Sequence, residues 1–260
     1  MTLTRLQKAE LLGEHILQKK RNVPMISFRF DDGNLSDYTE AFPRLRDAGL
    51  KGTYYIVEDW IGGSRLTPEQ IREMADAGHE IGSHTKTHPH LTEVTNEQLI
   101  NEFVSSKVFL EGITNKPCTS IAIPFGYYDE RVDRYTHSVY ENATVSRDYR
   151  GVYNPYGKLK NYPSVFMDAR SFEWVKMYID HAVENNGWLI IGAHLFRDVP
   201  VEELGENHVS PTEFQKVVNY VSGLVQQRAA LCVTVSEGSQ IIKGGNSWDI
   251  TTGKNLNYSL

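Results

Sequence analysis

The chain has 260 residues, 40% of them hydrophobic and 23% charged, which is ordinary for a globular protein and ample for a sizeable core. Its net charge is −6 and it has no basic run, which argues against a nucleic acid partner. No apolar stretch reaches the length of a membrane-spanning helix. Cys118 and Cys232 lie in apolar segments, where a reduced, buried pair is expected, so they do not fix the compartment.

The first 24 residues predict an amphipathic helix. Apolar residues recur among charged ones, at Leu6, Leu12, Ile16 and Leu17, with no continuous apolar run suited to a signal peptide. The localisation stays open. We expect a cytoplasmic protein if the chain is full length, and an extracellular or particle-borne one if a leader is removed or delivery follows another route.

From Met25 onward, predicted strands and helices alternate. The strands are expected at 25–30, 52–57, 80–83, 120–123, 143–146, 188–191 and 230–235. The helices are expected at 35–48, 67–77, 95–112, 129–140, 171–185 and 211–227. Residues 147–163, rich in Tyr, Gly, Asn and Pro, predict an ordered loop, and residues 244–260 a polar tail. This alternation indicates one α/β domain at 25–243, its parallel sheet either doubly wound or closed into a barrel.

Four of the nine histidines lie within residues 79–90, and three of them follow the strand predicted at 80–83. His84 and His88 stand four apart, a spacing that would place both imidazoles on one side of a helical turn. Two neutral imidazoles can hold one metal ion if an anionic ligand arrives from elsewhere. A histidine pair alone is weak evidence, since a His-rich loop can simply be solvated.

The candidate anionic ligand follows the first strand, at Asp31-Asp32-Gly33. A turn that caps the next helix would explain Gly33 and one aspartate, but not two like charges side by side. We therefore predict that Asp32, His84 and His88 bind a divalent metal ion and that Asp31 stays free to act as a base.

Both motifs, in this order, resemble the polysaccharide deacetylases of the NodB-homology type, also called carbohydrate esterase family 4. The family's Thr-Phe-Asp-Asp-Gly is matched by residues 29–33, with Arg29 in place of the Thr. Its His-(Ser/Thr)-x-x-His is matched by His84-Thr85-Lys86-Thr87-His88. The resemblance runs from about Met25 to about Val235. It implies an irregular (β/α) barrel of about seven strands and an acetylated glycan as substrate, and it leaves the oligomeric state open.

The resemblance also implies the roles of individual residues. Asp31 would be the catalytic base and Asp32 a metal ligand. His194, which ends an apolar strand, would protonate the leaving group, although a histidine there is otherwise expected to be part of the core. The backbone N–H of Phe125 would help to bind the oxyanion, the alternative being a plain strand-ending turn. Zinc is the expected ion, and cobalt, nickel or iron(II) also suit the ligand set.

Three positions depart from the family pattern. Ala122 replaces the arginine that orients the catalytic aspartate, and Arg29 or Arg147 could substitute for it. The aspartate of the fourth motif has no clear match, Asp148 being the nearest candidate. Gly192 stands where a leucine usually lines the pocket for the acyl methyl group, which leaves the acyl group open.

Three functions are therefore compared. The first is a metal-dependent deacetylase that acts on an N- or O-acetylated polysaccharide or oligosaccharide. The second is an amidohydrolase on a small or cyclic amide. The third is an inactive, glycan-binding descendant of the enzyme, which the missing arginine suggests. The presence of all the residues that do the chemistry favours the first.

Overall fold

Parallel strands form a ring that follows the chain order almost without a break. The computed structural model describes residues 23–146, 161–243, 247–249 and 254–256. The ring strands are β1 (Met25–Phe30), β2 (Gly52–Ile56), β3 (Glu80–Ser83), β4 (Ser120–Ala122), β5 (Asn142–Val145), β6 (Asn161–Pro163), β7 (Val165–Phe166) and β8 (Trp188–Ala193). Their pairing order is β6-β5-β4-β3-β2-β1-β8-β7, and β11 (Leu231–Cys232) also pairs with the start of β1.

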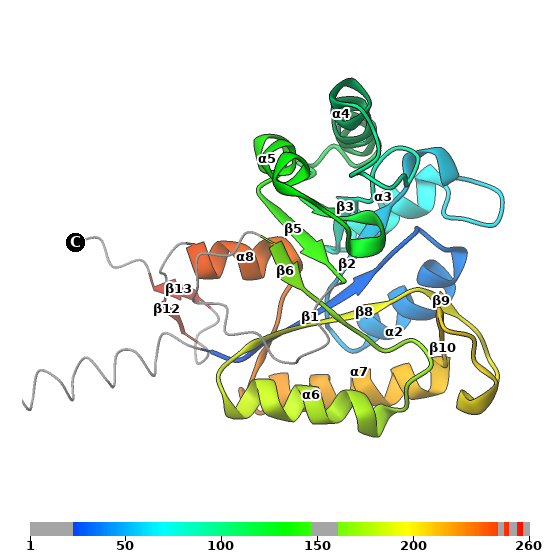
Figure 1. Cartoon of the computed structure of the whole chain (residues 1–260). Coiled ribbons are helices and arrows are strands. Elements are labelled where there is room, and N and C mark those ends of the chain that lie inside the picture. Colours follow the sequence, from blue (N-terminus) through cyan, green and yellow to red (C-terminus); the bar gives the residue numbers. More distant parts are fainter. Residues whose placement is uncertain (1–22, 147–160, 244–246, 250–253, 257–260) are drawn as a thin grey trace, which may run out of the picture.

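The two ends of this pairing order belong to one extended segment. β6 pairs with β5, β7 pairs with β8, and only Ser164 separates β6 from β7. The sheet is thereby nearly closed into a barrel, which confirms the predicted fold class (Figure 1). Eight strands lie on the path rather than about seven, because Ser164 divides one segment in two. The prediction of a loop throughout 147–163 was wrong at Asn161–Pro163, and residues 147–160 lie outside the described part.

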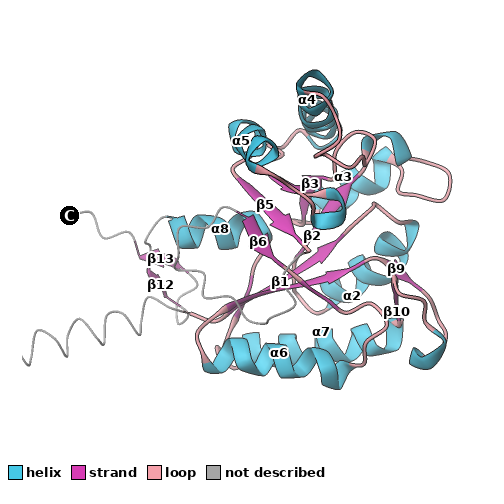
Figure 2. Ribbon diagram, in the orientation of Figure 1, coloured by secondary structure: helices cyan, strands magenta, loops and turns pink. Residues whose placement is uncertain are grey.

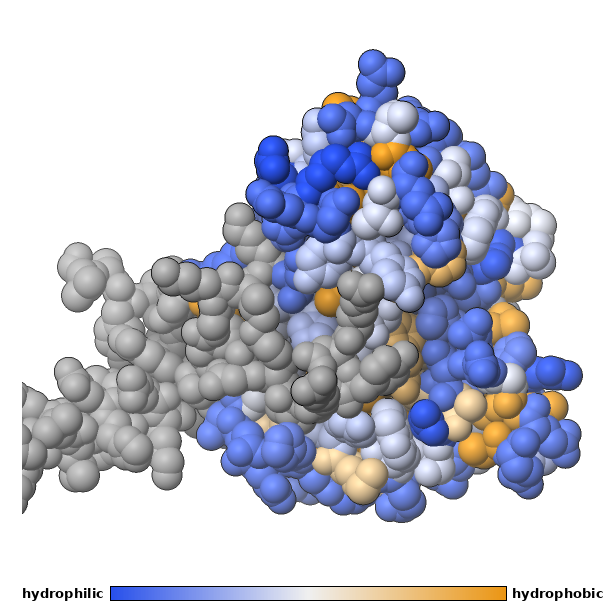
Figure 3. All heavy atoms as spheres, in the orientation of Figure 1, coloured by the Kyte–Doolittle hydropathy of each residue, from blue (hydrophilic) through white to orange (hydrophobic). Residues whose placement is uncertain are grey.

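Helices surround the strands (Figure 2). They are α2 (Phe42–Asp47), α3 (Pro68–Asp76), α4 (Asn96–Thr114), α5 (Glu130–Val139), α6 (Phe172–Glu184), α7 (Pro211–Gln226) and α8 (Val235–Lys243). A π-helical stretch, η1 (Asp37–Ala41), precedes α2, and short 3-10 turns occur at η2 (Glu58–Trp60), η3 (Pro124–Gly126) and η4 (Val201–Glu203). In the view of Figure 3, the surface formed by the described residues is mostly hydrophilic. No described helix is both long and apolar enough to cross a membrane.

The core lies between the strands and these helices. All six residues of β1 are buried, as expected for a parallel strand covered on both faces. Phe28 and Phe30 meet Phe214 of α7 edge to face, with ring centroids 5.7 and 5.8 Å apart. The predicted helix start at Thr67-Pro68 is confirmed, because Thr67 forms a capping box with Gln70.

The chain after β11 packs on the barrel end away from the carboxyl ends of the strands. The amide of Val235 donates to Thr53 Oγ1 on β2 (3.0 Å), and the amide of Ser236 donates to Glu80 Oε2, where β3 begins (2.9 Å). The predicted strand at 230–235 was therefore too long. Thr234 and Glu237 bond each other's backbone amides, a capping box that starts α8.

Two short strand pairs lie outside the barrel. β9 (Leu195–Phe196) runs parallel to β10 (His208–Val209). In the predicted polar tail, β12 (Ser247–Asp249) pairs antiparallel with β13 (Lys254–Leu256). Residues 1–22 of the helix predicted at 1–24 lie outside the described part, so the division into helix, barrel and tail stays a prediction.

Candidate active site

The carboxyl ends of neighbouring strands bring Asp31 and His194 together. β1 pairs with β8 up to Phe30 opposite Ala193, and the amide of Asp31 donates to Ala193 O at 3.1 Å. Asp31 and His194 directly follow these two strands. Their side chains meet at the carboxyl ends of the strands, with His194 Nε2 4.0 Å from Asp31 Oδ2. This is the edge at which active sites of parallel (β/α) barrels form.

Arg29 holds Asp31 through two bonds. Its Nε donates to Asp31 Oδ1 at 3.0 Å, and its second terminal nitrogen donates to Oδ2. The remaining terminal nitrogen donates to Ser164 Oγ at 2.9 Å. Arg29 and Asp31 are both buried. Burial raises the pKa of Asp31, but the charge of Arg29, with His84 and His194 nearby, outweighs burial and lowers that pKa to about 2.

Of the two arginines considered as substitutes at Ala122, Arg29 thus orients the aspartate. A bidentate guanidinium fixes a carboxylate in angle as well as in position. Arg147 lies outside the described residues.

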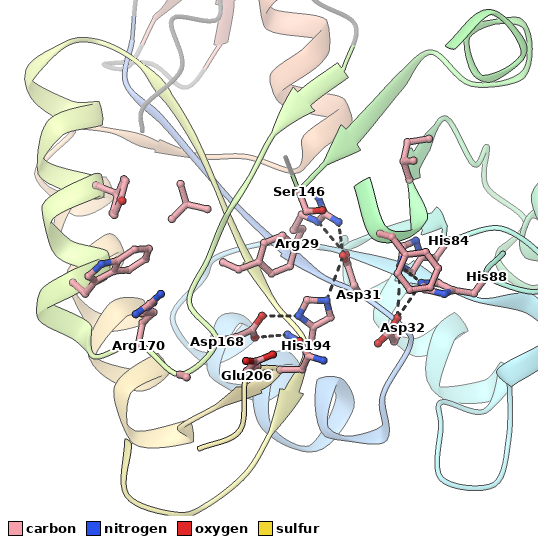
Figure 4. A pocket seen from close by; sticks show the side chains of 18 of the residues that line it. Arg29, Asp31, Asp32, His84, His88, Ser146, Asp168, Arg170, His194 and Glu206 are labelled. Atoms are coloured by element: carbon pink, nitrogen blue, oxygen red, sulfur yellow. Dashed lines mark hydrogen bonds and ion pairs between the residues drawn. The ribbon is translucent and has the colours of Figure 1, made fainter. Parts of the chain in front are cut away.

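Asp32, His84 and His88 converge beside Asp31 (Figure 4). Asp32 Oδ1 lies 3.6 Å from His84 Nε2 and 3.8 Å from His88 Nε2, and the two Nε2 atoms are 3.2 Å apart. A tetrahedral ion with bonds of about 2.0–2.2 Å needs ligand atoms roughly 3.4 Å from one another. The three predicted ligands therefore fit one divalent ion.

The histidine pair does not lie on a helical turn, so that part of the prediction was wrong. Residues 84–90 form a loop, in which Thr85 has φ 69° and His88 has φ 61°. Asp32, with φ 77°, is also in the left-handed region. Non-glycine residues in this region are strained, and such strain clusters at functional sites.

Both imidazoles are held in the form that binds metal. His84 Nδ1 donates to Ala122 O at 2.9 Å, which leaves the lone pair of its Nε2 facing Asp32. Burial lowers the pKa of His84 to about 4. Burial and the neighbouring His84 lower the pKa of His88 to about 4. Burial and Asp31 raise the pKa of Asp32. Two neutral imidazoles and a crowded carboxylate are stabilised together by a divalent cation.

His194 is anchored by an aspartate that the sequence reasoning missed. Asp168 Oδ2 accepts from His194 Nδ1 at 2.6 Å, and Asp168 Oδ1 accepts from the His194 amide at 3.0 Å. Burial lowers the pKa of His194, but Asp168, with Asp31 behind it, raises that pKa to about 9. Asp168 follows β7, which lay at the edge of the predicted loop, so the carboxylate was sought at Asp148. Asp148 lies outside the described residues.

Phe125 lies next to His88, and Gly192 lies behind the ring that stacks on His194. Phe125 has φ 57°, and its exposed ring lies 4.7 Å from the ring of His88. A Cβ on Gly192 would come within 2.6 Å of the Phe166 ring, which itself stacks on His194 at 4.8 Å. The space that a leucine at this position would fill is therefore taken by Phe166.

The predicted site residues line one cavity of about 820 Å³. Asp31, Asp32, His84, His88 and His194 face it, as does the ring of Phe125 at its rim. The ionised carboxylate of Asp31, the three predicted metal ligands and the protonated His194 thus share one space large enough for a sugar.

Comparison with known proteins agrees with this arrangement. A family profile described as polysaccharide deacetylase matches residues 18–144, the part that contains Asp31, Asp32 and the two histidines predicted to bind metal. Over these residues, just under half of its length, the chain matches the polysaccharide deacetylase family. The match ends before Asp168 and His194.

Individual members of this family match part of the chain. The Bacillus subtilis protein YxkH, itself named only as a candidate polysaccharide deacetylase, is 35% identical over 113 residues, 43% of this chain and 40% of YxkH. A peptidoglycan-N-acetylglucosamine deacetylase of Bacillus cereus is 29% identical over 114 residues, 43% of this chain and 51% of that enzyme. The matched region thus spans about half or less of either relative.

A solved structure confirms the fold over a longer stretch. The carbohydrate esterase domain of a multidomain xylanase from the hindgut metagenome of Trinervitermes trinervoides superposes with a TM-score of 0.57. The superposition covers 90% of this chain and 100% of that domain at 16% identity, so the likeness concerns the fold.

Proposed function

We propose that this chain is a metal-dependent hydrolase that removes acetyl groups from an N- or O-acetylated polysaccharide or oligosaccharide. The observation that carries the proposal is the meeting of Asp31 with the triad Asp32, His84 and His88 on one side and His194 on the other. The relatives whose names specify deacetylation of peptidoglycan N-acetylglucosamine support an acetamido sugar.

The ion expected at the triad, zinc with cobalt, nickel or iron(II) as alternatives, would polarise the acyl carbonyl and acidify water. Asp31 is ionised throughout the working pH range and accepts the proton of the attacking water. Arg29 keeps both carboxylate oxygens aligned during that transfer. The backbone N–H of Phe125 is proposed to stabilise the oxyanion.

His194 supplies the second proton transfer. With its pKa raised to about 9, it is protonated at neutral pH, and its Nε2 faces the cavity while Nδ1 donates to Asp168. It can therefore give a proton to the leaving nitrogen or oxygen as the acyl bond breaks. Asp31 thus begins the reaction as a negatively charged base and His194 as a positively charged acid, which are the states that the two proton transfers require.

The test combines metal analysis with an acetate assay. The protein is purified without chelator, bound metal is measured, and acetate release is followed from acetylated glucosamine oligomers and from acetylated xylan. We expect one equivalent of metal and acetate release from one of the two substrates. A His84→Ala, His88→Ala variant should lose both, whereas His181→Ala, at an exposed histidine of α6, should lose neither.

Two other outcomes of this test would favour the alternative functions. Bound metal without acetate release would indicate that the substrate carries another amide or acyl group in place of acetyl, as in the amidohydrolase alternative. Absence of metal from the unmutated protein, together with glycan binding that persists in Asp31→Asn, would leave the inactive binding descendant.

A further inference from the structure

The proposed chemistry uses only part of the cavity. The wall away from the metal triad is lined by Arg170, Trp174 and Tyr178, with Glu206 and Asn207 beside them. Arg170 follows β7, and the two aromatic residues lie one turn apart on α6. Figure 4 shows Arg170 on the far side of His194 and Asp168 from the metal triad. None of these five side chains has a role in the acetyl transfer described above.

Arg170 is the cation of this cavity that the reaction leaves unused. The other cationic side chains of the lining are already engaged, since Arg29 is bound to Asp31 and His194 to Asp168. Within the described residues, Arg170 has no carboxylate within ion-pair distance, and it is exposed. An uncompensated guanidinium in a substrate cavity attracts an anionic group.

The position of Arg170 is set by its neighbours. Its guanidinium carbon lies 5.0 Å from the ring centre of Trp174, a cation–π contact that covers one face of the guanidinium. The N–H edges of the group stay available, and these edges match a carboxylate in two parallel bonds.

The backbone around Arg170 is tied to the site. The amide of Ala169 donates to His208 O at 2.7 Å, and the amide of Arg170 donates to Met167 O at 3.0 Å. The same turn carries Asp168, which anchors His194. A group bound by Arg170 would therefore be held in a fixed relation to the acid that protonates the leaving group.

The adjoining wall suits a sugar. Tyr178 extends the aromatic surface beyond Trp174, at a centroid distance of 4.6 Å. Glu206, the other charged group of the lining without an ion pair in the described part, can accept hydrogen bonds from hydroxyl groups.

From these contacts we propose that this wall is a subsite for a carboxylate-bearing sugar and that Arg170 binds its carboxylate. The substrate would then be an acidic glycan, in which the acetylated sugar itself or its neighbour carries the carboxyl group. This inference rests on the proposed deacetylase function and narrows its substrate class.

The test compares matched substrates that differ only in the charge of the carboxyl group. One pair consists of oligomers of N-acetylglucosamine and N-acetylmuramic acid, with the lactyl carboxylate free or amidated. The other consists of oligomers alternating N-acetylglucosamine with a uronic acid, again free or amidated. The two pairs distinguish the two sources of the carboxylate.

In the unmutated protein we expect kcat/KM to be about 10–100 times higher for the free acid of one pair, the range of a hydrogen bond to a charged group. Arg170→Gln should remove this preference by lowering kcat/KM for the free acid far more than kcat/KM for the amidated substrate, and Arg170→Lys should restore part of the preference. Arg46→Gln is the matched control, since Arg46 also lies over an aromatic ring, that of Phe42, outside this cavity.

Equal rates on acid and amide, or an equal loss on both in Arg170→Gln, would overturn the subsite and leave the deacetylase in place. If no substrate releases acetate, the proposed function fails, and the subsite is tested separately by tryptophan fluorescence titration with the acidic oligomers. Binding that is lost in Arg170→Gln would then support the subsite, and absence of binding would overturn it.

Discussion

Arg29 takes over a task that the family gives to a residue elsewhere in the sequence. It lies two residues before Asp31 on the same strand, so its side chain points to the same side of the sheet and reaches both carboxylate oxygens. Ser164, at the junction of β6 and β7, holds its remaining terminal nitrogen. The position of the base therefore depends on the closure of the barrel.

Replacing Arg29 with lysine tests this arrangement. Lysine keeps the positive charge but not the planar two-point contact, so we expect kcat to fall about 100-fold, as for a catalytic group displaced by roughly 1 Å. Bound metal should remain at one equivalent, because Arg29 bonds Asp31 and not the triad. An unchanged kcat in a folded, metal-loaded variant would show that Asp31 needs no such anchor.

We expect Asp168 to set the alkaline limit of the proposed activity. It raises the pKa of His194 to about 9, and without it burial would lower that pKa. His194 must be protonated to act as an acid, so activity should persist to about pH 9 and fall above it. In Asp168→Asn the fall should move toward or below the ordinary histidine value of about 6.5. The measurement is kcat as a function of pH, and an unmoved alkaline limb would remove His194 from the acid role.

The same pKa has a consequence for stability. Since the folded pKa of His194 lies above its unfolded value, protonation stabilises the fold fully below about pH 6.5. This contribution is lost as the pH rises through about 9. The difference in unfolding free energy between the unmutated protein and Asp168→Asn should therefore shrink over that range.

The loop between β3 and α4 owes its shape to a buried glutamate of α4. Glu102 accepts from the amide of Thr87 at 2.8 Å and from its hydroxyl at 2.7 Å. Thr87 stands directly before His88, whose own amide donates to Thr85 Oγ1 at 3.0 Å. Glu102 thus holds the left-handed turn that brings His88 to His84.

Glu102→Gln should weaken metal binding about 10–100-fold, the usual cost of losing a partner that orients a ligand. The control is Glu111→Gln on the same helix, where the carboxylate accepts from the amide of Cys118 at 3.0 Å, away from the triad. Competition with a chromogenic chelator measures both affinities. Equal affinities in the two variants would show that the loop keeps its shape without Glu102.

The sequence predicted those site residues that directly follow a strand with a clear apolar pattern. The apolar runs that end in Asp31, His84 and His194 predicted both the strands and the residues that follow them. The helical turn at His84 and His88 was wrong, because residue spacing does not distinguish a helix from a loop with positive φ.

Asp168 was missed for a related reason. β6 and β7 have three and two residues, too few to show a period, and they lie beside a segment rich in turn-forming residues. Their pairing with β5 and β8 makes them strands, and such long-range pairing is not visible in a local pattern. The start of α8 was missed although Thr234 and Glu237 form a readable capping signal.

At the level of the whole molecule, the metal ion should stabilise the fold. Asp32 has a raised pKa next to Asp31, and the two neutral imidazoles face each other, so the triad without a cation gathers groups that repel one another. An ion at 100 times its dissociation constant should add about 2.7 kcal/mol to the unfolding free energy. At about 2–4 °C per kcal/mol, Tm should rise by about 5–10 °C.

This shift is measured by calorimetry with and without chelator. The His84→Ala, His88→Ala variant serves as the control and should show no shift. A Tm that the chelator leaves unchanged in the unmutated protein would mean that the ion contributes nothing to stability.

The positive φ angles at Asp32, His88 and Phe125 have a consequence for how this chain can change over generations. Glycine occupies such backbone at no steric cost, so it would relax each of these positions. A library selected only for heat resistance in the presence of a chelator, where the metal adds no stability, should therefore enrich glycine at all three, and its members should lose the reaction. Persistence of aspartate at position 32 and of histidine at position 88 would record continuous selection for the proposed reaction, whereas position 125 could change to glycine and keep its backbone N–H.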